Sequence, residues 1–276
     1  MRTHRILRRT LLAAARYARD HRRGLREIGE FLAFAAVAAA VIAIGSNRLS
    51  YDWQWFRVPR YLFDSAAEGL RPGVLLRGLG TTLQISALGL VLAAGIGLLT
   101  ALFRLSRLVT ANLIAQVYLE AVRNTPLLIQ LFLVYFVIAP IIGLSPFASA
   151  VVALSLFEGA YASEIIRGAI VSIPRHQWES CYCLGLTSID TYRHVVLPQA
   201  LRRILPPLTG QAVSLVKDSA LVSTIAISDL TMAGSATVSN TFLTFEIWFT
   251  VAAIYLIING VLSLLSHIIE VKLRIT

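Results

Sequence analysis

The sequence predicts an all-α, polytopic membrane protein. Of its 276 residues, 57% are apolar and 14% are charged, whereas about 25% of the residues of a soluble domain are charged. Four stretches contain no Asp, Glu, Lys or Arg at all: 31–47, 78–103, 124–157 and 247–269. Runs of this kind along the whole chain exclude a soluble fold, and they cannot all be secretion signals. We therefore expect the chain to cross a bilayer several times.

The lengths of the apolar runs predict six crossings. About 20 helical residues cross a hydrocarbon core, so the run 124–157 is too long for one span. Two prolines and a glycine between Pro140 and Pro146 predict a turn inside it. The predicted spans are 78–103, 112–138, 148–168, 199–227 and 247–270, with the shorter, Ala-rich stretch 31–46 as a sixth candidate.

The distribution of basic residues predicts the orientation. Cytoplasmic loops retain Lys and Arg, and exported loops are depleted of them. The first 30 residues contain nine Arg, and further basic residues lie at 104–107, 167–203 and 272–274. The connections 139–147 and 228–246 contain no Lys or Arg. Six spans with both termini in the cytoplasm fit this pattern.

Two segments flank the first candidate span. We interpret residues 1–30 as a basic cytoplasmic tail that sets topology and contacts anionic membrane lipid, and not as a nucleic-acid arm. Residues 47–72 contain Tyr51, Trp53, Trp55, Phe56 and Tyr61, and such rings favour the membrane interface. We predict an external interfacial linker there. Against the general rule, the external segment 48–77 keeps five Arg at positions 48, 57, 60, 71 and 77, beside Asp52, Asp64 and Glu68.

One long polar loop, 174–198, has internal order. Gln177 to Leu184 predict a short helix that Gly185 ends, and Ser188 to Leu197 predict a second one. Pro198 is expected to restart the chain into the next span. Most loops in helical bundles are shorter, so a structured loop of this length predicts a docking surface.

The same loop resembles the cytoplasmic EAA loop of ABC importer permeases. The resemblance rests on Glu179-Ser180-Cys181, then Gly185, then Val195-Val196-Leu197-Pro198, with Ser180 and Cys181 where two alanines are usual. Across about 70–272 the chain is similar to polar amino-acid permeases, through 79–86, 104–107, 123–130, 168–174, 197–200 and 217–223. Residues 156–167 are most similar to glutamate/aspartate permease subunits.

This resemblance implies the fold and its divisions. The expected fold is a type I ABC importer-like transmembrane domain with five core spans plus one N-terminal helix. The divisions are the tail 1–30, an extra N-terminal transmembrane helix 31–46, the linker 47–72, and a permease domain 73–272 with its coupling loop 174–198. The expected location is the cell inner (plasma) membrane.

The resemblance also implies partners. The chain has no Gly-x-x-x-x-Gly-Lys-Ser/Thr loop to cradle nucleotide phosphates. No catalytic residue and no cofactor is therefore expected in this chain, and ATP-Mg is expected on partner ABC ATPase subunits. The other implied partners are a second permease subunit, identical or related, and an external substrate-binding protein. The expected ATPase-coupling residues are Glu179, Ser180, Cys181, Gly185, Leu197 and Pro198. Glu179 is either a charged docking contact or an ordinary solvated carboxylate.

Placing an ionisable side chain within a bilayer costs free energy, so each such residue calls for a structural or functional explanation. The substrate-path candidates are Arg123, Asn124, Thr125, Glu158, Tyr161, Lys217 and Asp218. Arg123 to Pro126 place a cation, an amide and a helix break inside a span, which is one way that membrane proteins build polar sites. Glu158 can line the path, pair with Arg123 or Lys217, or be held neutral by burial.

Other interpretations of these charges stay open. Arg123 and Lys217 can supply countercharge to an acidic amino acid, or pair with Glu120 and Asp218 instead. Glu164 and Arg167, three residues apart, are expected to form a structural pair. The substrate is expected to be glutamate or aspartate, with glutamine, histidine, arginine or cystine as alternatives. An ion-coupled secondary transporter is a further alternative, but it has no use for the docking loop. No metal-binding or catalytic constellation is visible, and His267 stands alone.

Overall fold

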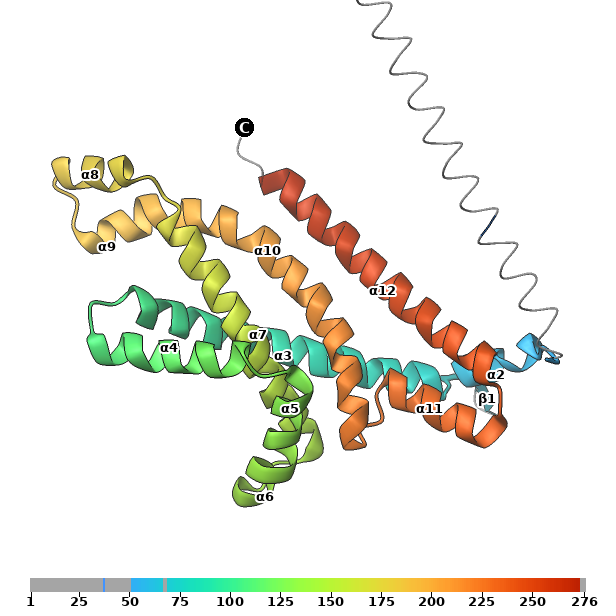
Figure 1. The fold of residues 1–276 in the computed structure, drawn as a ribbon. Coiled ribbons are helices and arrows are strands. Elements are labelled where there is room, and N and C mark those ends of the chain that lie inside the picture. Colours follow the sequence, from blue (N-terminus) through green and yellow to red (C-terminus); the bar gives the residue numbers. More distant parts are fainter. Residues whose placement is uncertain (1–36, 38–50, 67–68, 274–276) are drawn as a thin grey trace, which may run out of the picture. The chain divides into compact units, whose positions relative to one another are not determined.

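The computed structural model describes residues 37, 51–66 and 69–273 (Figure 1). The chain divides into two compact units, with the boundary between Trp53 and Gln54. The predicted basic tail, and the predicted N-terminal span apart from Val37, lie outside the described residues. The elements below all belong to the second unit.

The second unit begins with short elements packed against the start of its first long helix. They are the 3₁₀ turn η1 (Trp55–Arg57), α2 (Pro59–Leu62), and an antiparallel pair of strands, β1 (Phe63–Ala66) and β2 (Gly69–Pro72). In the hairpin, Phe63 lies opposite Pro72 and Asp64 opposite Arg71. The sequence did not predict strands in this linker.

The long helix α3 (Val74–Leu105) contains the whole predicted span 78–103. It is followed by α4 (Val109–Arg123), α5 (Leu127–Phe132), the π-helical segment η2 (Leu133–Ile138) and the short α6 (Ala139–Ile142). The axes before and after the break at 124–126 differ by 107°. The helix break predicted inside the span 112–138 is confirmed: the missing N–H of Pro126 ends the first helix, and the packing of α5 gives the chain a new direction.

The helix α7 (Pro146–Val171) is the central one. The hydroxyl of Ser145 accepts the N–H of Ala148 at 3.2 Å and caps its start. It packs closely on α3 through glycines: a Cβ built on Gly97 would lie 2.7 Å from Cβ of Ala162. Small residues let membrane helices approach closely, which is the usual way that they associate.

The remaining elements run from the polar loop 174–198 to Leu273. The loop helix α8 (Arg175–Cys183) is followed by α9 (Ser188–Thr191), the π-helical η3 (Tyr192–Val196) and α10 (Leu197–Asp218). Then come the 3₁₀ segment η4 (Ser219–Ile225), α11 (Leu230–Thr241) and α12 (Thr244–Leu273). The expected restart at Pro198 is wrong: α9, η3 and α10 form one continuous helix, because the wide π turn before Pro198 accommodates a residue without an N–H.

The stretch 228–246, expected as a connection, holds the helix α11. Asp229 caps its start, since its carboxylate accepts the backbone N–H of Met232 at 2.8 Å and of Thr231 at 3.2 Å. The axis of α11 is bent by 49° from the axis of the preceding helical segment, which runs from Ser188 to Ile225. By length and composition, α3, α7 and α12 are long and apolar enough to cross a membrane, and up to five spans result if each bent pair counts as one.

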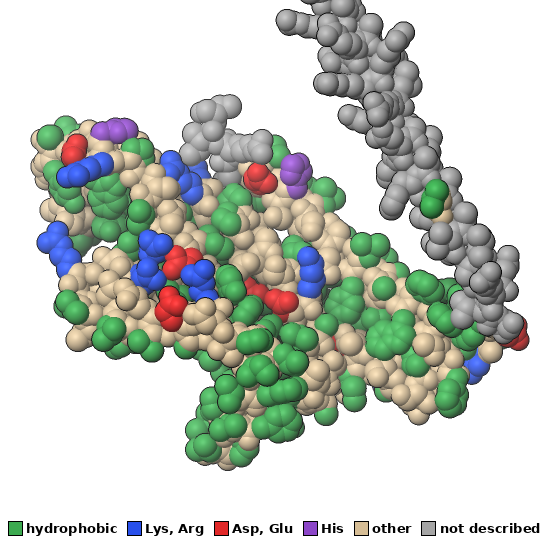
Figure 2. All heavy atoms as spheres, viewed as in Figure 1, with side chains coloured by type: hydrophobic (Ala, Val, Ile, Leu, Met, Phe, Trp, Pro, Cys, Tyr) green, Lys and Arg blue, Asp and Glu red, His purple; other side chains and the backbone are tan. Residues whose placement is uncertain are grey.

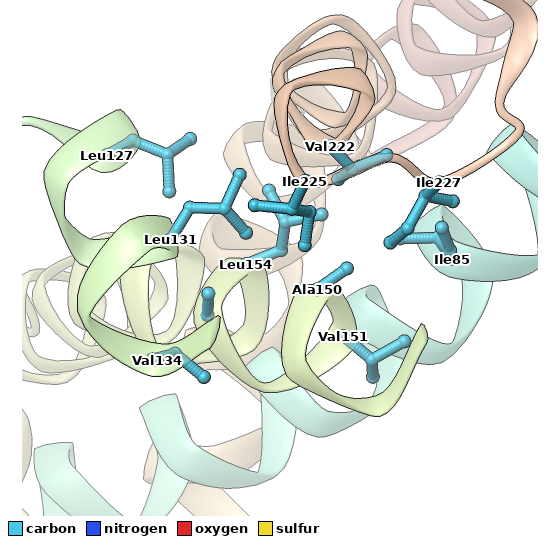
Figure 3. Close-up of a cluster of buried hydrophobic side chains, with 11 residues drawn as sticks. Ile85, Leu127, Leu131, Val134, Ala150, Val151, Leu154, Val222, Ile225 and Ile227 are labelled. Atoms are coloured by element: carbon cyan, nitrogen blue, oxygen red, sulfur yellow. The ribbon is translucent and has the colours of Figure 1, made fainter. Parts of the chain in front are cut away.

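One buried cluster ties the bent helices together. Leu127 and Leu131 of α5 and Val134 of η2 point toward α7, where Leu154 is 1% exposed (Figure 3). Val222 and Ile225 of η4 close the cluster from the other side. In contrast, the apolar side chains of α12 are mostly exposed, as expected for a helix that faces lipid or another subunit.

Candidate functional site

A sharp corner separates the two loop helices, and Gly185 forms it. Gly185 has φ +74°, a left-handed conformation that glycine adopts without strain. Its N–H donates to the carbonyl of Tyr182 at 3.0 Å, and the N–H of Leu186 donates to the carbonyl of Cys181 at 3.0 Å. This pair of bonds is a Schellman motif, which satisfies the last carbonyls of α8. The helix end predicted at Gly185 is confirmed.

The next helix begins immediately after the corner. The hydroxyl of Thr187 accepts the N–H of Asp190 at 3.2 Å and donates to the carboxylate of Asp190 at 2.5 Å. A threonine cap with an acidic residue three positions later is a common start for a helix. Two capped ends only three residues apart leave the corner little freedom.

The coupling loop, defined as residues 174–198, is anchored to the membrane helices. Val196 is 1% exposed and packs with Ala200, Ile166 and Ile170. The rings of Trp178 on α8 and Tyr192 on η3 meet edge to face at 5.2 Å. A guanidinium nitrogen of Arg203 donates to the carbonyl of Ser172 at 2.8 Å. The loop is therefore packed directly on α7 and α10.

The outer surface of the coupling loop is apolar at its corner. Leu184 is 79% exposed, Ile189 is 77% exposed and Tyr182 is 54% exposed. The helices α8 and α9, on which Tyr182 and Ile189 lie, are at the end of the unit far from α11 (Figure 1). Sequence reasoning missed all three, although apolar residues in a polar loop were a visible signal. Exposed apolar groups of this kind mark an interaction surface.

The predicted coupling residues differ in their placement. Glu179 is exposed and pairs with Arg175 on its own helix at 3.1 Å. Ser180, Leu197 and Pro198 are exposed, and the Ser180 hydroxyl donates to the carbonyl of His176 at 2.8 Å. Cys181 is only 4% exposed, so its side chain belongs to the interior of the loop.

Deeper in the helices, two carboxyl groups meet. Glu158 on α7 is 3% exposed, and its carboxylate accepts the side-chain amide of Gln211 on α10 at 2.9 Å. The carboxyl group of Asp218 lies close enough to Glu158 to interact with it. Glu158 and Gln211 line a cavity of about 390 Å³ whose other walls are mostly aliphatic, including Leu90, Leu205 and Leu262. Of the three possibilities for Glu158, an ion pair with Arg123 or Lys217 is not found among the described residues.

A second charged group surrounds Glu164. Its carboxylate lies 3.1 Å from Arg104 of α3, 2.8 Å from Arg167 of α7 and 3.9 Å from Arg123 of α4. The predicted pair of Glu164 with Arg167 is confirmed. The guanidinium of Arg123 also lies 5.9 Å from the ring centre of Tyr161. Figure 2 shows basic and acidic side chains gathered where α7 crosses α4.

The other candidates fall outside these two groups. The Asn124 amide donates to the carbonyl of Glu120 at 2.9 Å and to its carboxylate at 2.7 Å, and the Thr125 hydroxyl donates to the carbonyl of Ala121 at 2.8 Å. They cap the end of α4. Glu120 is thus held by Asn124 and not by Arg123, so the alternative pairing of Arg123 with Glu120 is also wrong. Lys217 is exposed and adjacent to Asp218.

Comparison with known proteins places the chain in a family. Residues 93–275 match the family described as the binding-protein-dependent transport system inner membrane component. The chain is 40% identical over 202 residues to the L-cystine transport system permease protein TcyB of Bacillus subtilis (strain 168), covering 72% of this chain and 86% of the relative. It is 39% identical over 232 residues to the glutamine transport system permease protein GlnP of Escherichia coli (strain K12), covering 82% of this chain and the whole relative.

Solved structures agree with this placement. A crystal structure of an amino acid ABC transporter with histidines has a chain that is 34% identical, with a TM-score of 0.68 over 72% of this chain and 94% of that one. An inward-facing structure of the MetNI methionine ABC transporter is 20% identical with a TM-score of 0.62, which supports the fold alone. The expected all-α, ABC importer-like transmembrane fold is confirmed. The chain belongs to the family of binding-protein-dependent transport system inner membrane components.

Proposed function

We propose that this chain is the permease subunit of an ABC importer that moves a polar amino acid into the cytoplasm. The observation that carries the proposal is the coupling loop: two capped helices at a rigid corner, an exposed apolar surface, and firm anchorage to α7 and α10. The relatives named for cystine, glutamine and octopine transport support an amino-acid substrate.

ATP-Mg binds to and is hydrolysed by partner ABC ATPase subunits under this proposal, and the permease chain itself is not an enzyme. The exposed corner around Leu184 and Ile189 seats in the ATPase surface, with Glu179 at its edge. Because α9, η3 and α10 form one helix, closure of the ATPase pair tilts α10 as a lever. A second permease subunit, identical or related, completes the assembly.

The orientation follows from the charges. The coupling loop, the basic tail and the C-terminus lie in the cytoplasm, and the hairpin of β1 and β2 faces the outside of the inner membrane. The family description supplies the external binding protein as the partner that delivers the substrate. The basic tail contacts anionic membrane lipid.

The substrate path runs past the two charged groups. Arg123 is the cation best placed for a substrate carboxylate, because its side chain is 48% exposed and it lies at a helix break. Of the three arginines around the Glu164 carboxylate, it is also the farthest from that carboxylate. Glu158 and Asp218 suit the ammonium group that every amino acid carries. Glutamate and aspartate are the substrates to test first, and glutamine, cystine, histidine and arginine come next.

The test is uptake into proteoliposomes that hold the complex purified from its own membranes. We expect an ATPase to remain bound, and ATP-dependent uptake of an amino acid that requires the binding protein. Competition by each amino acid in turn then identifies the substrate. Uptake that persists without ATP and follows an ion gradient would refute the proposal and favour an ion-coupled carrier.

Glu158 offers a matched test of the path. Glu158→Gln keeps the size and the hydrogen bond capacity toward Gln211 but removes the charge, so we expect weaker substrate selection with unchanged assembly. The exchange Glu158→Gln with Gln211→Glu moves the charge to the neighbouring helix and serves as the companion variant. Unchanged competition profiles in both would remove this pair from the substrate path.

A further inference from the structure

A polar cavity lies at the end of the described unit opposite the coupling loop. It has a volume of about 390 Å³, opens to the surface, and is lined by α2, β1, the start of α3 and α11. Its polar lining consists of Arg60, Asp64, Arg77, Thr237, Asn240 and Thr241. The cavity at Glu158 has mostly aliphatic walls, so this second cavity differs from it in kind and suits an ionic group.

Close backbone contacts fix the walls of this cavity. A Cβ on Gly73 would lie 2.4 Å from the carbonyl oxygen of Tyr61, and the N–H of Gly73 donates to the carbonyl of Leu62 at 2.7 Å. On the other side, a Cβ on Gly78 would lie 2.7 Å from the carbonyl oxygen of Asp229. Both glycines allow contacts that no other residue permits. The arginines of α2 and α3 therefore face α11 across a distance set by the backbone.

The charges of Arg60 and Arg77 are not neutralised by an ion pair with any carboxylate that the structure describes. The guanidinium of Arg60 lies 4.8 Å from the ring centre of Tyr61 and donates to the hydroxyl of that tyrosine. Within the described part of the chain, no carboxylate lies within ion-pair distance of Arg60 or Arg77. Asp64 lines the cavity but is not paired with either of them. The cavity therefore has an excess of positive charge and two guanidinium groups that can grip a carboxylate.

The sequence gives a second, independent reason to assign a role to these residues. Residues 48–77 contain five Arg and three acidic residues, although segments outside the membrane are normally depleted of basic residues. Anchoring by aromatic rings does not require this excess of positive charge. A negatively charged partner on the outside accounts for Arg60 and Arg77, the two of these arginines that line the cavity.

We propose that this cavity is a docking site for an acidic side chain of the external binding protein, with Arg60 and Arg77 as the cationic pair that grips its carboxylate. The inference rests on the proposed function, because it requires this end of the unit to face outward. The family's dependence on a binding protein supplies the occupant, and the charge of the cavity supplies the complementarity. Asn240, on an exposed face of α11, offers a further amide donor at the rim.

The experiment measures ATP hydrolysis by the full complex in lipid nanodiscs as the purified, substrate-loaded binding protein is titrated. We expect Arg60→Glu and Arg77→Glu each to raise the concentration for half-maximal stimulation by about threefold to tenfold, with a weaker dependence on salt. Stimulation at saturating binding protein should be retained. Arg107→Glu, in the turn between α3 and α4, makes the same charge reversal away from the cavity and should leave the titration unchanged.

A charge exchange controls for misfolding. In combination with Arg77→Glu, replacement of the matching acidic residue of the binding protein by arginine should restore the titration. If the binding protein stimulates the wild-type complex, and the Arg60 and Arg77 variants reach half-maximal stimulation at the same concentration as the wild type, the inference is overturned. The proposed function would then remain intact. The absence of any stimulation by a binding protein in the wild-type complex would refute the proposed function itself.

Two other sources of negative charge have distinct signatures. If the effect of the variants occurs in nanodiscs of phosphatidylglycerol and vanishes in phosphatidylcholine, the cavity holds a lipid phosphate and the inference is overturned. If the variants change the substrate concentration for half-maximal uptake at saturating binding protein, and not the binding-protein titration, the cavity holds the carboxylate of the free substrate. That result overturns the inference as well.

Discussion

Replacing Gly185 by valine should uncouple ATP hydrolysis from transport. Gly185 has φ +74°, and a side chain in this region costs about 1–2 kcal/mol for an ordinary L-residue. No heavy atom lies within 4 Å of a Cβ built at this position, so the valine side chain has room. The change therefore acts on the backbone of the corner and not on packing.

The expected magnitude follows from that cost. A penalty of about 1–2 kcal/mol lowers the population of the native corner by a factor of roughly 5–30. Binding to the ATPase can restore the corner at the expense of affinity, so this factor is the upper limit for the loss of coupling. We expect uptake per ATP hydrolysed to fall several-fold in reconstituted complexes, while assembly in detergent persists.

Two further variants isolate the cause. Gly185→Asn should retain most of the coupling, because asparagine tolerates the left-handed region better than valine does. Gly260→Val adds the same side chain in α12, where a built Cβ also meets nothing within 4 Å and no left-handed φ is involved. Unchanged uptake per ATP with Gly185→Val would refute the reasoning. An equal loss with Gly185→Asn would show that the positive φ is not the reason.

Three other predictions follow from the described contacts. Leu184→Ser should reduce the amount of ATPase that co-purifies with the chain, because this side chain is 79% exposed at the corner; retention of the full amount would count against an apolar docking surface. Gly97→Leu should lower the free energy of unfolding in detergent by about 1–3 kcal/mol, since a Cβ there would lie 2.7 Å from the Cβ of an alanine of α7. Gly95→Leu, which meets nothing within 4 Å on the same helix, is its control, and equal losses would contradict the explanation. Arg123→Gln and Lys217→Gln should weaken uptake without loss of assembly, and full uptake in both would exclude them from the path.

Local features of the fold were predictable from the sequence. A proline without an N–H and a glycine in a polar loop act on their own neighbours, so the break at Pro126 and the corner at Gly185 could be located in advance. The helix α11 was missed because 228–246 has no apolar run long enough for a span. Its signal was the capping residue Asp229, which needs no apolar run.

Partners across helices could not be predicted in the same way. The 107° bend after α4 depends on where Leu127 and Leu131 find their buried contacts on α7 and η4. Likewise, Glu158 meets Gln211, which is 53 positions away in the chain. A polar amide in an otherwise apolar stretch was the only sign of Gln211. Such pairings are set by helix rotation and depth, which a single sequence does not record.

The continuous helix of α9, η3 and α10 links the coupling loop to Gln211, the partner of Glu158. Ile189 and Gln211 are 22 positions apart on it, so their separation along the axis is about 33 Å. A tilt of about 10° about one end therefore moves the other end by about 6 Å, which is more than one helical turn. Such a lever works only if it is stiff, and Pro206 and Pro207 interrupt its hydrogen bonding. Close to these prolines the hydroxyl of Thr209 bonds to the carbonyl of Pro206 at 2.7 Å and to the hydroxyl of Ser266 at 2.6 Å, which ties α10 to α12. The neighbouring helix α12 therefore braces α10 two residues before Gln211, which is where the lever needs support if its tilt is to reach Glu158.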